Sequence, residues 1–126
     1  MNESKSLLVS RPDPEAEYMT PERCRILELW NDKRDSTVSI ARATVAQGTT
    51  TQLHRLRGVD ERYIVVQGHG RVSIGQIEPE NLGPGDVVAI PAGTAQQITN
   101  IGDNDLIFYC ICSPGFFAEC YESLEN

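Results

Sequence analysis

Three polar residues, from three separate stretches of the sequence, carry side chains that together could move a proton or hold a small molecule: His54, Glu61 and Gln96. An imidazole beside a carboxyl group can act as a general acid–base pair, with the surroundings setting each pKa. A carboxamide stays neutral while it donates and accepts hydrogen bonds, so Gln96 would orient a polar ligand. This chemistry requires the three side chains to meet in one hollow, and the elements that carry them must therefore converge.

Short strand-like runs, separated by turns rich in glycine and proline, make up most of the chain and predict an all-β sandwich or barrel. The expected strands cover residues 24–30, 37–46, 63–66, 71–74, 86–90, 96–101 and 106–112. No segment between 37 and 112 keeps a helical period over the length that a stable helix needs. The Gly-rich residues 67–70 predict a hairpin between their flanking strands.

Positions two apart on a strand share a face, because successive side chains point to opposite sides of a sheet. His54 and Leu56 should project to the same side, and Tyr63 should share the face of Glu61. If that side is the cavity, Leu56 shapes its wall and Tyr63 adds a hydroxyl or a stacking surface.

The two ends of the chain differ from this β-rich middle. Residues 1–17 hold two prolines and several charges without a clean period, and we expect an N-terminal arm followed by one domain over 18–126. Near the other end Phe117, Cys120, Tyr121 and Leu124 fall at helical spacing, which predicts a short C-terminal helix over 116–124.

Composition narrows the possible partners and location. The 126 residues carry a formal charge of −7, with a pI near 4.7, which disfavours a nucleic-acid partner because phosphate binding needs a basic face. The apolar runs are far shorter than the ~20 residues that span a bilayer, so we expect no membrane span. The first residues show no apolar signal segment, and a cytoplasmic location is expected.

Four cysteines fit that location better as thiols than as disulfides. They are Cys24, Cys110, Cys112 and Cys120, and two of them form a CxC pair inside an apolar run. The spacing lacks the paired motifs of a structural zinc site. We therefore expect buried thiols; the alternative is that one of them faces a cavity and touches a ligand.

Two spaced motifs surround the three polar residues. The first places five, one, four and six residues between Gly48, His54, Leu56, Glu61 and Gly68. The second places five, one, two and three residues between Gly85, Pro91, Gly93, Gln96 and Asn100. Together they resemble the two motifs of the cupin superfamily, G(x)5HxH(x)3-4E(x)6G and G(x)5PxG(x)2H(x)3N, over about residues 37–113.

The resemblance implies a double-stranded β-helix, or jelly-roll barrel, and a homodimer. Within the superfamily the chain looks closest to small single-domain cupins of the mannose-6-phosphate-isomerase-like type. In metal-bearing cupins three histidines and the glutamate usually form the ligand set. This chain departs from that set twice, since Leu56 and Gln96 stand where the family pattern has its second and third histidines.

Three functions remain open for this degenerate motif. In the first, a divalent metal ion of unknown identity is held by His54, Glu61 and Gln96, completed by water or by a chelating substrate. In the second, His54 and Glu61 are catalytic without metal, in an isomerase or epimerase. In the third, the residues bind a small ligand without catalysis. We expect a small-molecule site, metal-assisted or not, for a sugar or another small polar metabolite.

Overall fold

Short strands alternate with tight turns through residues 8–125, the part of the chain that the computed structural model describes. The strands are β1 (Tyr18–Met19), β2 (Arg25–Trp30), β3 (Ser39–Val45), β4 (His54–Leu56), β5 (Asp60–Gln67), β6 (Gly70–Ile74), β7 (Glu80–Leu82), β8 (Val87–Ile90), β9 (Gln96–Asn100), β10 (Leu106–Ser113) and β11 (Tyr121–Ser123). Single 3-10 turns occupy Pro14–Ala16, Lys33–Asp35 and Ala118–Cys120. The all-β prediction is confirmed. Among residues 8–125 no helix is long and apolar enough to cross a bilayer.

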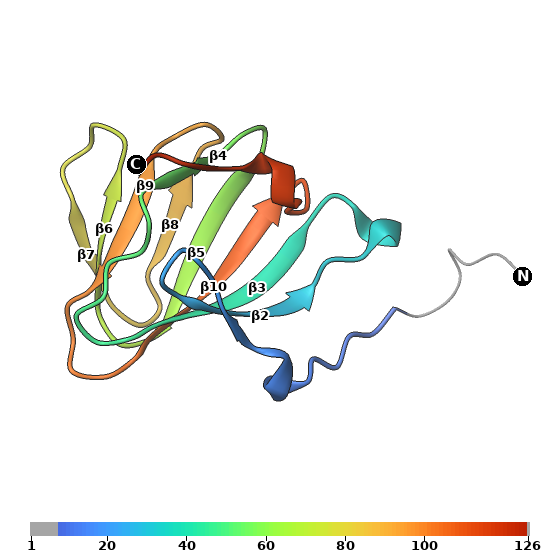
Figure 1. Ribbon diagram of the computed structural model, residues 1–126, viewed down its shortest axis with the longest axis horizontal. Coiled ribbons are helices and arrows are strands. Elements are labelled where there is room, and N and C mark those ends of the chain that lie inside the picture. Colours follow the sequence, from blue (N-terminus) through green and yellow to red (C-terminus); the bar gives the residue numbers. More distant parts are fainter. Residues whose placement is uncertain (1–7, 126) are drawn as a thin grey trace, which may run out of the picture.

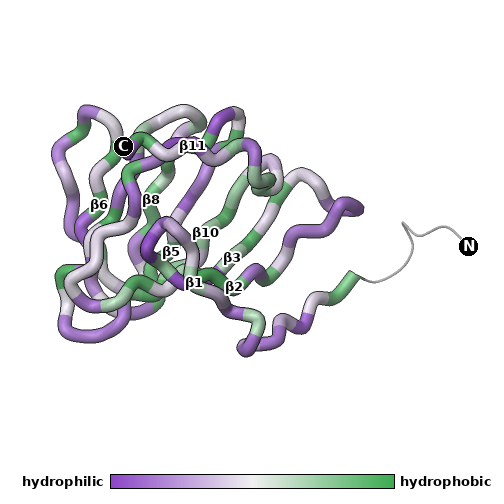
Figure 2. Tube along the Cα trace, in the orientation of Figure 1, coloured by the Kyte–Doolittle hydropathy of each residue, from purple (hydrophilic) through white to green (hydrophobic). Residues whose placement is uncertain are grey.

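Two antiparallel sheets face each other and form the predicted jelly-roll barrel (Figure 1). The larger sheet runs in the order β1-β2-β3-β10-β5-β8, and the smaller in the order β11-β4-β9-β6-β7. Apolar residues recur along the strands, whereas the turns are mostly hydrophilic (Figure 2). This alternation gives each sheet one buried face.

The core is filled by the inward residues of both sheets. On β10 the side chains alternate strictly between buried and half-buried, with Leu106, Phe108, Cys110 and Cys112 pointing inward. Opposite them, Val72 and Ile98 come from the smaller sheet. Polar side chains are buried between the sheets as well, among them His54, Glu61 and Gln96.

The predicted hairpin at residues 67–70 is wrong, because β5 and β6 do not pair. β5 lies between β10 and β8, whereas β6 lies between β9 and β7 in the other sheet. The turn therefore crosses from one sheet to the other. Gly68 permits this, since it has φ +83° and a Cβ there would lie 2.8 Å from the carbonyl oxygen of Asp105. Local sequence signals a turn but not the sheet of the next strand.

The predicted C-terminal helix is also wrong. Residues Tyr121–Ser123 form β11, which pairs with β4 so that Tyr121 lies opposite Leu56 and Ser123 opposite His54. The 3-10 turn at Ala118–Cys120 directly precedes it. Nine residues are too few for a helix that packing does not support, and the free edge of β4 offers a hydrogen-bonded alternative.

Candidate functional site

The structure brings the three polar residues together between the sheets. His54 on β4 lies directly opposite Gln96 on β9 in the smaller sheet. The Nε2 of Gln96 donates a hydrogen bond to Oε1 of Glu61 at 3.0 Å, and Glu61 comes from β5 in the larger sheet. An imidazole, a carboxyl group and an amide thus converge from three strands.

A cavity of about 110 Å³ opens beside them. His54, Leu56, Glu61 and Tyr63 line it, as the two-residue spacing on their strands predicts, while Gln96 lies behind the wall, 1% exposed. The volume is somewhat smaller than the ~150 Å³ cavity that accommodates a benzene molecule. A ligand of a few non-hydrogen atoms fits inside, and a larger one would extend through the mouth.

His54 is held neutral and in one tautomer. The ring is 4% exposed and stacks on Tyr121, with centroids 4.6 Å apart and planes inclined by 18°. Its Nδ1 lies 2.7 Å from the backbone carbonyl oxygen of Gln52, which can only accept, so Nδ1 carries the proton. Burial lowers the pKa of His54. The Nε2 lone pair is therefore a hydrogen-bond acceptor and a base.

Glu61 is buried, and both of its carboxyl oxygens have a hydrogen-bond partner. Its Oε1 accepts from Gln96, and its Oε2 accepts from the Cys112 thiol at 3.6 Å. Burial raises the pKa of Glu61 to about 7, although these hydrogen bonds act in the opposite direction. The carboxyl group can therefore act as an acid or as a base near neutral pH.

Gln96 and Tyr63 fix the position of this carboxyl group. The Tyr63 hydroxyl donates to Oε1 of Gln96 at 2.5 Å, so the amide turns its nitrogen toward Glu61. The Tyr63 ring packs against Phe108, with centroids 4.4 Å apart. The arrangement makes Gln96 a positioning residue rather than a group exposed to the cavity.

Glu22 is a cavity residue that no sequence motif marks. It belongs to the loop between β1 and β2, where Thr20, Glu22 and Cys24 alternate and all three line the cavity. Burial raises the pKa of Glu22 to about 7, with a smaller contribution from the nearby charge of Glu61. The only sequence signal is this two-residue alternation, and Pro21 gives the same stretch the pattern of a simple turn.

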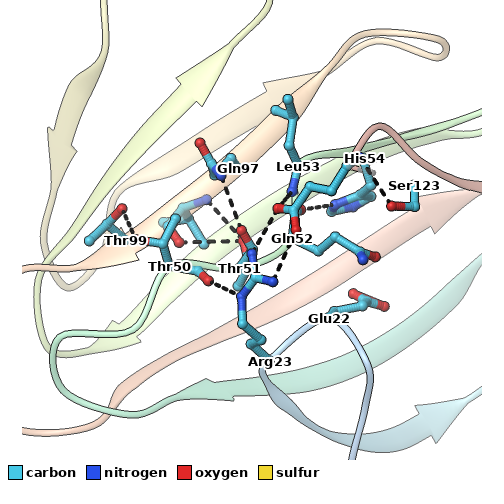
Figure 3. A network of polar contacts seen from close by, with 12 residues as sticks. Glu22, Arg23, Thr50, Thr51, Gln52, Leu53, His54, Gln97, Thr99 and Ser123 are labelled. Carbon is cyan, nitrogen blue, oxygen red and sulfur yellow. Dashed lines mark hydrogen bonds and ion pairs between the residues drawn. The ribbon is translucent and has the colours of Figure 1, made fainter.

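The loop holds Glu22 in place through its neighbour, Arg23. Arg23 has φ +70°, so its side chain and that of Glu22 diverge (Figure 3). The guanidinium group donates to the carbonyl oxygen of Thr50 at 2.8 Å, and the amide of Gln52 donates to the carbonyl oxygen of Glu22 at 3.0 Å. The loop is thereby joined to the segment that leads into β4 and His54.

Three of the four thiols face the same cavity. Cys110 and Cys112 share the inner face of β10, as their spacing predicts, and Cys24, just before β2, lines the cavity as well. Cys120 packs instead with Leu56 under the C-terminal segment. All four are free, and burial raises the pKa of each thiol, that of Cys24 to about 12. They line the cavity as neutral, weakly polar groups.

The side chains at the motif positions do not form the ligand set that would hold a metal ion if all three histidines were present. Leu56 presents hydrocarbon, and the Gln96 oxygen accepts the Tyr63 proton while its nitrogen faces Glu61. Within residues 8–125 no group of three or more His, Cys, Asp or Glu side chains is arranged to bind a metal. One imidazole and one carboxylate are fewer protein ligands than transition metals usually require.

Comparison with known proteins agrees with this architecture. Residues 41–112 match the cupin domain family. Protein MJ1618 of Methanocaldococcus jannaschii, which is uncharacterised, is 32% identical over 110 residues, covering 86% of this chain and 87% of that protein.

Two solved structures show how varied the similar proteins are. The nucleoside dehydratase Pac13 of Streptomyces superposes with a TM-score of 0.75 at 16% identity, covering 91% of this chain and 90% of its own. An oxalate decarboxylase superposes with a TM-score of 0.75 at 26% identity, covering 87% of this chain but 30% of its own. The Bacillus subtilis oxalate decarboxylase has Mn(II) centres. Enzymes with different chemistries therefore use this fold.

Proposed function

The chain belongs to the cupin domain family, and we propose that it is a metal-free acid–base enzyme acting on a small polar molecule in its barrel cavity. The observation that carries the proposal is the pairing, in one cavity, of a buried Glu61 with a pKa of about 7 and a neutral His54. The two groups supply an acid and a base at the same pH.

Proton transfer between a carbon and an oxygen of the ligand is the reaction that these groups suit. Nε2 of His54 removes a proton from the carbon next to a carbonyl group, while protonated Glu61 donates its proton to the carbonyl oxygen. The resulting enediol is a neutral species. The protonated His54 then returns its proton to the former carbonyl carbon, while ionised Glu61 takes the proton of the hydroxyl group on the adjacent carbon, where the new carbonyl group forms. Both side chains regain their starting protonation, and protons and electrons balance.

The surrounding residues position Glu61 and His54 for the reaction. Gln96 and Tyr63 orient the Glu61 carboxyl group, and Gln52 fixes the His54 tautomer. Leu56 and the neutral thiols exclude water, which strengthens the hydrogen bonds that form in the reaction. From the mannose-6-phosphate-isomerase-like type the proposal takes the class of reaction, an isomerisation. It does not include a metal ion.

Solvent deuterium exchange tests the proposal without knowledge of the natural substrate. Small hydroxy- and amino-carbonyl compounds, beginning with dihydroxyacetone, are incubated with the protein and a chelator in D2O, and proton NMR follows loss of the signal next to the carbonyl group. We expect exchange by the wild type and a loss of roughly 100-fold or more in Glu61→Gln and in His54→Phe.

A matched control is Glu78→Gln, which changes an exposed carboxyl group outside the cavity. It should exchange as the wild type does. If no compound of the series exchanges, or if exchange survives in both cavity variants, acid–base catalysis is rejected and the non-catalytic binding function is favoured.

A further inference from the structure

The charge of the cavity wall restricts what can bind there. Three glutamates line it: the buried Glu61 on β5, the half-buried Glu22 in the loop between β1 and β2, and the exposed Glu28 on β2. Among the lining residues that the structure describes, none is a lysine or an arginine. Sites for phosphate and carboxylate groups use such cations or a helix N-terminus, and this wall offers neither.

Several hydrogen-bond donors on the cavity wall already have protein partners. The Tyr63 hydroxyl donates to Gln96, the Tyr121 hydroxyl to Gln52, and the Cys112 thiol to Glu61. In their ionised form the glutamates of the cavity wall present only acceptors. A ligand that satisfies them must bring donors of its own.

A second, independent observation comes from His54. Its ring is 4% exposed and lines the cavity, and Nδ1 is bonded to the Gln52 carbonyl oxygen. Within the described part of the chain, Nε2 has no side-chain or backbone hydrogen-bond partner. This acceptor on the cavity wall is therefore open to a hydrogen-bond donor of a ligand.

We propose that Glu22 and Glu61 together select ligands that carry hydrogen-bond donors and no negative charge, with a small organic ammonium as the best fit. The proposal rests on the cavity of the proposed function and adds its ligand class. Glu22 is in this role a binding residue, since it lines the same cavity as Glu61. Because the loop is tied to Thr50 and Gln52, the carboxyl group is positioned before the ligand arrives.

Three two-carbon probes of nearly equal size test how binding depends on the charge of the ligand: ethanolamine, ethylene glycol and glycolate. Each is titrated into the 15N-labelled protein, and the dissociation constant is read from shifts of the amides of cavity residues. We expect ethanolamine to bind tightest, with ethylene glycol weaker and glycolate roughly tenfold or more weaker than ethanolamine. Equal or tighter binding of glycolate overturns the proposal, as does a lack of ethanolamine shifts at these amides.

Two substitutions test the role of Glu22. Glu22→Gln keeps the shape and removes the charge, so ethanolamine binding should weaken roughly three- to tenfold while ethylene glycol binding changes little. Glu78→Gln, outside the cavity, should leave all three constants unchanged. If the two variants behave alike, Glu22 has no part in selecting charge, and the proposal is rejected.

This test and the exchange test of the proposed function fail separately. Ethanolamine has no carbonyl group and reports binding alone. Selective ethanolamine binding without any deuterium exchange would retain the ligand class and reject the catalysis. Deuterium exchange together with tight glycolate binding would retain the catalysis and reject the ligand class.

Discussion

Arg23 and Glu125 form a two-pronged ion pair that joins the loop beside the cavity to the C-terminal segment, with N–O distances of 3.0 and 2.7 Å. The same carboxyl group accepts a hydrogen bond from the backbone amide of Leu53 at 2.8 Å. Leu53 precedes His54 directly. One carboxylate therefore links the loop that carries Glu22 to the strand that carries the imidazole.

Loss of this link should loosen the loop without unfolding the barrel. In Glu125→Gln we expect faster hydrogen exchange at the amides of Arg23 and Gln52, whose bonds hold the loop closed. Amides in the paired strands β3 and β10 should keep their protection. Uniformly faster exchange in loop and strands alike would show that the pair supports global stability instead.

The buried Glu61 should make the protein less stable as pH rises. Burial raises the pKa of the folded state from 4.5 to about 7, so the folded protein binds this proton more tightly than the unfolded chain does. The resulting stability is complete below about pH 4.5 and is lost as pH increases to about 7, by an amount of order 3 kcal/mol. Urea unfolding across this range measures it.

Glu61→Gln removes the titrating group but keeps a hydrogen-bonding side chain of the same size. The part of the pH dependence that comes from Glu61 should disappear in this variant, leaving a smaller slope from Glu22, whose pKa is also raised to about 7. An unchanged slope in Glu61→Gln would mean that the carboxyl group has an ordinary pKa, and the acid–base proposal would lose its main support.

Metal content should depend on the two positions that depart from the family pattern. Wild-type protein purified without added metal should contain far less than one equivalent of transition metal, and a chelator should not change its Tm. The double variant Leu56→His, Gln96→His restores the two missing imidazoles beside His54 and Glu61, and it should bind one equivalent of Zn2+ or Ni2+. Elemental analysis provides the measurement.

Stoichiometric metal in the wild type that is lost in His54→Ala would contradict this expectation and favour the metal-assisted function. The double variant should also be less stable without metal, because Leu56 is 3% exposed and a buried imidazole there costs about 2–3 kcal/mol. Added metal should recover that loss.

The four thiols should react slowly in the folded protein. All are buried, and burial raises their pKa values, so little reactive thiolate exists near neutral pH. Alkylation with iodoacetamide, followed by mass spectrometry, should modify none of the four rapidly without denaturant and all four in it. Rapid modification of Cys112 alone would reveal an activated thiol beside Glu61.

The homodimer expected from the family resemblance can be checked by light scattering. The larger sheet turns half-buried residues outward, including Ile64, Tyr109 and Ile111. We expect a particle of twice the mass of one 14.0-kDa chain, and Tyr109→Arg should shift it toward the monomer. A monomeric wild type would contradict the prediction.

Most strands and turns, and the side chains that share a strand face, follow from the order of the amino acids alone. In a pleated strand, side chains two positions apart lie on the same face. His54 therefore shares a face with Leu56, and Glu61 with Tyr63, whichever strands pair with theirs. The motif glycines and prolines likewise mark where the chain must turn.

Other features depend on the folded molecule, since pairing partners are chosen by free energy over the whole chain and not by local pattern. Residues 121–123 became a strand because β4 had an open edge, and the turn at Gly68 changed sheets because β6 is paired by β9 and β7. Glu22, in a loop with no motif, became part of the cavity because Arg23 and Gln52 hold that loop against the barrel. Burial, which only the folded chain creates, then raised the pKa values of Glu22 and Glu61 together.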